Sequence, residues 1–167
     1  MVGFSIRYLL WVALLFFLLF FEGVSPLFVF NEWQTQLTIF ITRLWVEGLH
    51  LPVLIQADTL ILANKMHLQI LHECNGLTPY LLYLAAILAY PTDLKSKTLW
   101  LLIGYVAIVL INTVRMLGIT LVVIDSPERF HLVHDWIGRY GVGILTVLIF
   151  YLFTNLVSVH KQSSLSK

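Results

Sequence analysis

The sequence predicts an all-α integral membrane protein with about four transmembrane helices, an extracytoplasmic amphipathic helix and a small β-hairpin. Of its 167 residues, 59% are hydrophobic and 11% are charged, and the mean hydropathy is +0.89. A soluble domain carries about 25% charged residues, so this chain has too few charges to cover a water-facing surface. Its length suits one membrane domain over residues 1–167. The net charge of +1 favours no nucleic-acid partner.

The first apolar run covers residues 8–21 and extends towards the N-terminus through Val2–Ile6, across Arg7. We expect it to form the first transmembrane helix. A cleaved signal peptide has a similar basic start and apolar centre, but no A-x-A cleavage site follows this run at Glu22–Pro26. We therefore expect the helix to be retained.

Residues 31–50 place apolar side chains close to helical spacing, with amide and charged side chains between them. The apolar positions are Trp33, Leu37, Phe40, Ile41, Leu44, Trp45 and Leu49. This pattern predicts an amphipathic helix on the outer membrane surface. Pro52 then breaks the pattern, and the alternating residues 53–71 predict a β-hairpin with Asn64 and Lys65 in its turn.

Three more apolar runs predict spans, because a transmembrane helix needs about 20 mostly apolar residues. These runs cover residues 77–90, 99–124 and 137–159. Lys95 and Lys97 lie between the second and third spans, and Lys161 and Lys167 lie in the C-terminal tail. Cytoplasmic loops carry an excess of lysine and arginine. Four spans then leave both termini inside, in a multi-pass protein of the cell inner membrane.

Three polar residues lie at the outer ends of three different predicted spans. Cys74 precedes the second span and His134 precedes the fourth. Arg115 follows about sixteen apolar residues of the third span, roughly 24 Å from its inner end at 1.5 Å per residue. The topology therefore predicts that they meet at one depth on the extracytoplasmic face. Asn112, one helical turn before Arg115, can orient the guanidinium.

Each of these residues also has an ordinary explanation. An arginine in lipid is costly, which makes Arg115 a functional candidate, but an arginine can also snorkel to the interface. Cys74 is the only cysteine and lies at a helix start, where a thiolate is stabilised, yet it can equally be an inert filler. His134 has His131 and Asp135 beside it, which also suits a solvated amphipathic helix.

Taken together, the three residues have a chemical logic. The imidazole exchanges a proton, the thiolate attacks a carbonyl carbon, and the arginine stabilises the oxyanion that forms. Their joint placement predicts an active site on the periplasmic face that uses neither a metal nor a cofactor.

Three short elements follow each other in the chain: Cys74-Asn75-Gly76, Asn112-Thr113-Val114-Arg115 and His134-Asp135-Trp136-Ile137-Gly138. In order and position they resemble the exosortase/archaeosortase family. That family carries a Cys-[Ser/Thr/Asn]-Gly, an Asn-x-x-Arg and a His-x-x-x-Gly element at outer helix ends. The resemblance covers about residues 50–157. The chain departs from the larger bacterial members by having fewer spans and no extra soluble domain.

The resemblance implies a membrane cysteine protease or transpeptidase that acts through a thioacyl intermediate. Its substrates would be exported proteins that end in a short motif, a transmembrane helix and a basic tail. By position, Cys74 would be the nucleophile, His134 the general acid and base, and Arg115 the oxyanion stabiliser. The residues expected to bind substrate or support these three are Asn75, Gly76, Asn112, His131 and Asp135. His131 is the alternative base if the helix phase differs.

Two other functions remain open from the residues alone. One is a non-enzymatic membrane scaffold or assembly factor, in which Arg115 and the histidines bind partner helices or lipid head groups. The other is a metal or proton pathway, although the spacing of the candidate ligands matches no tight set. Those candidates are His67, His72, Glu73, Cys74, His131 and His134.

Overall fold

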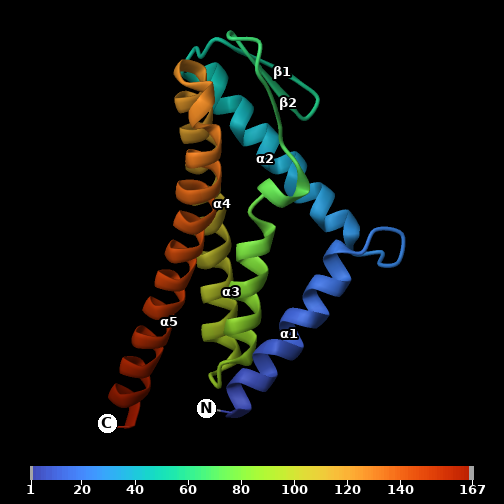
Figure 1. Cartoon of the computed structure of the whole chain (residues 1–167). Coiled ribbons are helices and arrows are strands. Elements are labelled where there is room, and N and C mark those ends of the chain that lie inside the picture. Colours follow the sequence, from blue (N-terminus) through green and yellow to red (C-terminus); the bar gives the residue numbers. More distant parts are fainter. Residues whose placement is uncertain (1, 166–167) are drawn as a thin grey trace.

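The computed structural model describes residues 2–165 and is a helical bundle that carries a small sheet at one end (Figure 1). This confirms the predicted all-α membrane fold with a small β element. In chain order the elements are α1 (Val2–Phe20), α2 (Phe28–Gly48), β1 (Val53–Gln56), β2 (Thr59–Leu62), β3 (His67–Gln69), the 3₁₀ helix η1 (His72–Cys74), α3 (Leu77–Ala89), α4 (Leu94–Asp125), the 3₁₀ helix η2 (Pro127–Arg129), the π-helix η3 (Leu132–Tyr140) and α5 (Gly141–Leu165).

Three helical stretches in the described residues are long and apolar enough to cross a membrane: Val2–Phe20, Leu94–Asp125 and Pro127–Ser158. The helix α3 is apolar but has only 13 residues, about 20 Å at 1.5 Å per residue, against a hydrocarbon core of about 30 Å. It packs against α1, α4 and α5. The predicted number of four spans therefore stays a prediction.

Two of these helices begin earlier than their apolar runs suggest. The helix α1 continues through Arg7, whose Nε donates to the Gly3 carbonyl at 2.9 Å, so the charge does not end it. The helix α4 begins at Leu94 because the Asp93 carboxylate accepts the Ser96 amide at 2.8 Å and caps its N-terminus. This bond lowers the pKa of the Asp93 carboxyl group.

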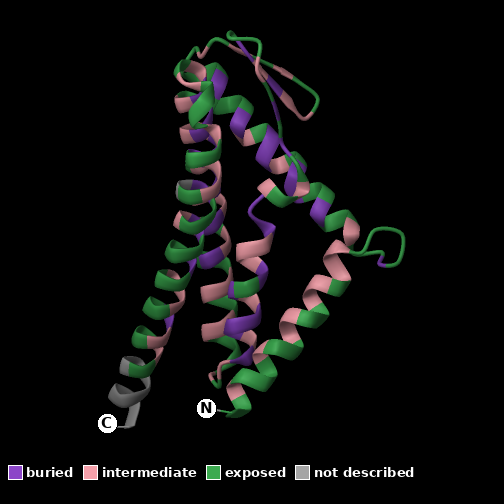
Figure 2. Ribbon diagram, viewed as in Figure 1, coloured by how far each residue is buried: buried purple, intermediate pink, exposed green. Residues whose placement is uncertain are grey.

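The helix α2 runs from Phe28 to Gly48, where residues 31–50 were predicted. Buried and exposed positions alternate along α2 (Figure 2). The buried positions are mostly polar, and the exposed ones include large apolar residues. The buried positions are Asn31, Gln34, Thr35, Thr38, Ile39, Thr42 and Val46, and the exposed apolar ones include Trp33, Phe40, Leu44 and Trp45. The polar side chains of α2 therefore turn towards the rest of the chain.

The predicted hairpin over 53–71 is instead a three-stranded antiparallel sheet in the order β1-β2-β3. A second turn, at Ala57 and Asp58, breaks the expected long first strand. Ala57 has φ +52°, and the Asp58 carboxylate accepts hydrogen bonds from the Gln69 and Thr59 side chains, which lower the pKa of that carboxyl group. Asp58 is a turn-forming residue within the alternating pattern, and that signal was missed.

The apolar core has two parts, one on each side of the residues that carry the predicted site. One part packs the sheet against α4 and includes Leu60, Ile70, Met116, Ile119 and Val123. The other part includes Tyr83, Ile87, Ile108 and Phe153 from α3, α4 and α5. At Gly104 a Cβ would overlap the Tyr83 ring, so this glycine lets α3 and α4 approach closely.

Candidate active site

The Cys-Asn-Gly sequence forms a tight turn between η1 and α3. Gly76 has φ +79°, in the left-handed region that favours glycine, and a Cβ there would lie 3.0 Å from the Asn112 side chain. The Asn75 Oδ1 accepts the Leu77 amide at 2.8 Å in an Asx turn that leads into α3. The turn therefore holds Cys74 beside the N-terminus of α3, close to α4.

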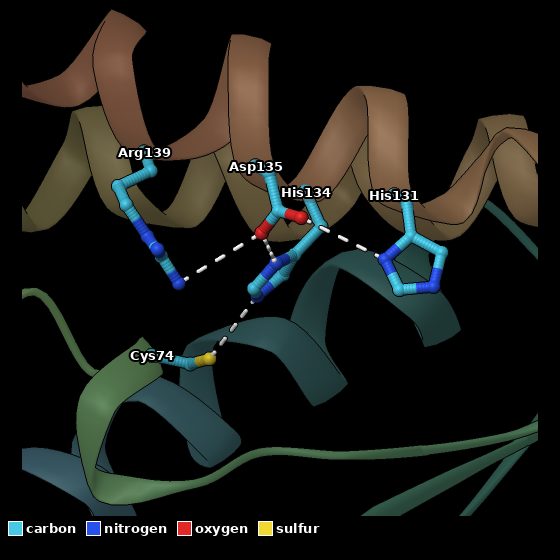
Figure 3. Close-up of polar contacts among 5 residues, drawn as sticks. All are labelled: Cys74, His131, His134, Asp135 and Arg139. Atoms are coloured by element: carbon cyan, nitrogen blue, oxygen red, sulfur yellow. Dashed lines mark hydrogen bonds and ion pairs between the residues drawn. The ribbon is translucent and has the colours of Figure 1, made fainter.

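The Cys74 thiol faces a histidine–aspartate pair on η3 (Figure 3). Its Sγ lies 3.7 Å from His134 Nε2, and His134 Nδ1 lies 2.9 Å from Asp135 Oδ1. A carboxylate only accepts hydrogen bonds, so Nδ1 carries the ring proton and Nε2 is free to accept the thiol proton. The His134 ring also stacks on Phe130, with centroids 5.1 Å apart. The arrangement matches a nucleophile, a base and an orienting acid.

Arg115 approaches the same place from α4. Its Nη1 donates to Asn112 Oδ1 at 3.3 Å, while Asn112 Nδ2 donates to the Cys74 carbonyl at 3.0 Å. Its buried Nε has no hydrogen-bond partner. A Cβ at Gly138 would lie 2.7 Å from that Nε, so any other residue there would displace the guanidinium. Asn112 thus links the arginine to the backbone of the cysteine.

These groups line one cavity of about 460 Å³ between α3, α4 and the π-helix. Its walls include Cys74, Asn112, Arg115 and His134. A second, apolar cavity of about 420 Å³ lies beside it, between α1, α3 and α5. Pro79, Leu82 and Gly143 line both cavities, so the two are adjoining. The polar cavity can hold a carbonyl group near the thiol, and the apolar one can hold hydrophobic side chains.

The model of the transmembrane exosortase family matches residues 1–151 of the chain. The chain belongs to the transmembrane exosortase family. The match covers all the residues that line the polar cavity and most of the bundle. No curated protein and no solved structure matches the chain.

Several of the residues singled out from the exosortase sequence come together in space. Cys74, Gly76, Asn112, Arg115 and His134 line the cavity. Among the other three, Asn75 is buried behind Cys74 and Asp135 holds the His134 ring. His131 lies apart, with 88% of its side chain exposed and its Nδ1 3.6 Å from Asp135 Oδ2. The thiol therefore faces His134 and not the alternative base.

Sequence reasoning missed Arg139 and the polar side chains of α2. Arg139 lines the cavity, and its Nη2 lies 3.8 Å from Asp135 Oδ1, four residues earlier (Figure 3). That i, i+4 spacing of opposite charges was a usable signal. The α2 side chains carried no comparable signal, because the amphipathic pattern does not show which face packs inward.

The described part of the exosortase, residues 2–165, contains no group of three or more histidine, cysteine, aspartate or glutamate residues placed to hold a metal ion. His67, one of the candidate ligands, lies on β3 and pairs with Ile61 in the sheet. His72 contacts Thr35, with Nδ1 2.9 Å from the hydroxyl. Neither histidine lines the cavity that holds Cys74.

Proposed function

We propose that the chain is a cysteine protease or transpeptidase of the inner membrane that processes C-terminal sorting signals of exported proteins on the extracytoplasmic face. The observation that carries the proposal is the alignment of Cys74, His134 and Asp135, in which Cys74 and His134 line a cavity together with Arg115. A scaffold that only binds partner helices needs no such alignment of a thiol with an oriented imidazole.

The proposed reaction begins when the Cys74 proton moves to His134 Nε2. The thiolate attacks the carbonyl carbon of the scissile peptide, and Arg115 stabilises the oxyanion. The carbon–nitrogen bond then breaks as His134 gives its proton to the leaving amine, and a thioacyl intermediate remains on Cys74. Water or an acceptor nucleophile loses a proton to His134, attacks the thioester and releases the thiol.

The proposed substrates carry a cleavage motif followed by an apolar helix and a basic tail. The adjoining cavities support this class, since the polar one suits the motif and the apolar one suits the start of the helix. The apolar cavity extends along α5 from Gly143 to Phe150, which corresponds to about 10 Å or two helical turns. A basic tail would stay at the cytoplasmic side.

Replacing the nucleophile tests the proposal directly. We expect Cys74→Ala and Cys74→Ser to lower the rate of precursor cleavage by roughly a thousandfold or more, because removal of a catalytic triad nucleophile leaves only binding and oxyanion stabilisation. The precursor is a protein of the same genome that ends in a motif, a helix and a basic tail, and it is followed by immunoblotting of membranes. Equal amounts of folded enzyme are the control. Normal processing by Cys74→Ala would exclude the thioacyl mechanism.

A further inference from the structure

The buried face of α2 carries more polar groups than the packing of a helix requires. Burying a polar group without a hydrogen bond is unfavourable, so these side chains need partners. The Thr35 and Thr38 hydroxyls contact carbonyls of their own helix and also contact Asn75. The Asn31 and Gln34 side chains reach other elements. Their partners show what this face of α2 does.

The main partner is Asn75, the residue that follows Cys74 and is 0% exposed. Its Nδ2 donates to Asn31 Oδ1 at 2.7 Å and to Thr35 Oγ1 at 2.9 Å. Its carbonyl accepts Gln34 Nε2 at 3.1 Å and the Thr38 hydroxyl at 3.2 Å. Its Oδ1 is already bonded to the Leu77 amide. Both polar side-chain atoms of Asn75 and its main-chain carbonyl therefore have hydrogen-bond partners.

The same face is also connected to α4, which carries Arg115. The Tyr105 hydroxyl donates to Gln34 Oε1 at 2.8 Å. Asn112 lies seven residues, or two turns, further along α4 and donates to the Cys74 carbonyl. The Asn75 carbonyl is thus held from α2, and the Cys74 carbonyl is held from α4.

We infer that Gln34, Thr38 and Tyr105 are positioning residues that hold the Cys74 thiol at His134. None of the three lines the cavity, so they act through the turn and not on a substrate. The distance that they maintain is the 3.7 Å between Sγ and His134 Nε2. A misplacement of about 1 Å in a catalytic geometry can cost about a hundredfold in rate. The inference rests on the proposed role of Cys74 as nucleophile.

The chain offers closely matched variants for a test. Thr38→Val removes a hydroxyl that reaches Asn75, and Tyr105→Phe removes the bond to Gln34. Thr42→Val is the same substitution one turn along α2, where the hydroxyl is buried and has no partner. Thr120→Val removes only a bond within α4, to the Met116 carbonyl. Thr38, Thr42 and Thr120 are 3%, 2% and 1% exposed, so burial is equal.

The probe is iodoacetamide, which alkylates only Cys74 because the chain has no other cysteine. We measure its rate constant at pH 7 on the full-length protein in membranes, for each variant with His134 present and with His134→Ala. We expect the wild-type rate to fall roughly tenfold in His134→Ala, since the Cys74 thiol loses the group that accepts its proton. Thr38→Val and Tyr105→Phe should lower the rate several-fold with His134 present and change it little in His134→Ala.

The outcomes separate the inference from the proposed function. A loss in Thr38→Val and Tyr105→Phe that depends on His134, with no loss in Thr42→Val or Thr120→Val, supports positioning. Rates in Thr38→Val and Tyr105→Phe equal to those of the two controls overturn the inference and leave the function intact. A loss of the same size with and without His134 shows a general structural role and also overturns it. Equal alkylation of wild type and His134→Ala overturns the proposed function, and the inference with it.

Discussion

At the scale of single residues, Asp135 sets which nitrogen of His134 faces the thiol. We expect Asp135→Asn to lower the rate constant of precursor cleavage by roughly a hundredfold or more, because an amide can also donate and then favours the wrong tautomer. Steady-state kinetics in membranes check this, with Asp125→Asn, at the end of α4, as the matched control. A loss of less than about threefold would mean that His134 needs no orienting carboxylate.

A second single residue, Gly138, leaves the space that the Arg115 guanidinium occupies. We expect Gly138→Ala to lower precursor cleavage by about a hundredfold, the effect of losing one oxyanion donor, because its Cβ would displace the guanidinium. The control is Gly118→Ala on α4, where an added Cβ has no neighbour within 4 Å. Both variants are compared for cleavage rate and for melting temperature. Equal cleavage by Gly138→Ala and Gly118→Ala would show that Arg115 tolerates displacement.

At the scale of elements, Asn64 fastens the sheet to the end of α4. Its Nδ2 donates to the Val123 carbonyl at 2.8 Å, and its Oδ1 accepts the Met66 amide at 2.9 Å. We expect Asn64→Ala to lower the free energy of unfolding by about 1 kcal/mol through these lost bonds. Asn64→Asp keeps the acceptor but puts a negative charge at a helix C-terminus, so it should destabilise at least as much. Thermal unfolding in detergent checks this order, and an Asn64→Asp variant as stable as wild type would contradict it.

The elements differ in how far the sequence reveals them. The long apolar helices follow directly from hydropathy, because only a helix satisfies its backbone within lipid. The turn at Asp58 and the inward polar face of α2 depend on tertiary contacts, which a single strand or helix pattern does not contain. The same holds for the site: helix ends place Cys74 and His134 at one depth, but the support from Gln34 and Tyr105 becomes visible only when α2 is packed.

At the scale of the whole molecule, the length of α4 gives the depth at which we expect the Cys74 thiol to lie in the membrane. The Lys97 Nζ donates to the Leu88 carbonyl, at the end of the bundle that the lysine distribution predicts to face the cytoplasm. Asn112, which contacts the Cys74 carbonyl, lies fifteen residues further, about 22 Å away. A hydrocarbon core is about 30 Å thick, so in the predicted orientation we expect Cys74 to lie below the outer boundary of the bilayer. A reagent would then reach the site through the cavity and not from open water.

This depth predicts a distinct labelling pattern in cells whose outer membrane has been permeabilised and whose inner membrane is sealed. A small charged methanethiosulfonate should modify Cys74 from outside, whereas a maleimide on a long polyethylene glycol chain should not fit the cavity. In a Cys74→Ala background, Ala63→Cys in the sheet turn should react with both reagents. Lys95→Cys, in the first turn of α4, should react only after the inner membrane is permeabilised. Labelling of Lys95→Cys in cells with a sealed inner membrane would contradict the predicted orientation. Modification of Cys74 by the bulky maleimide would place the thiol at the surface instead of within the bilayer.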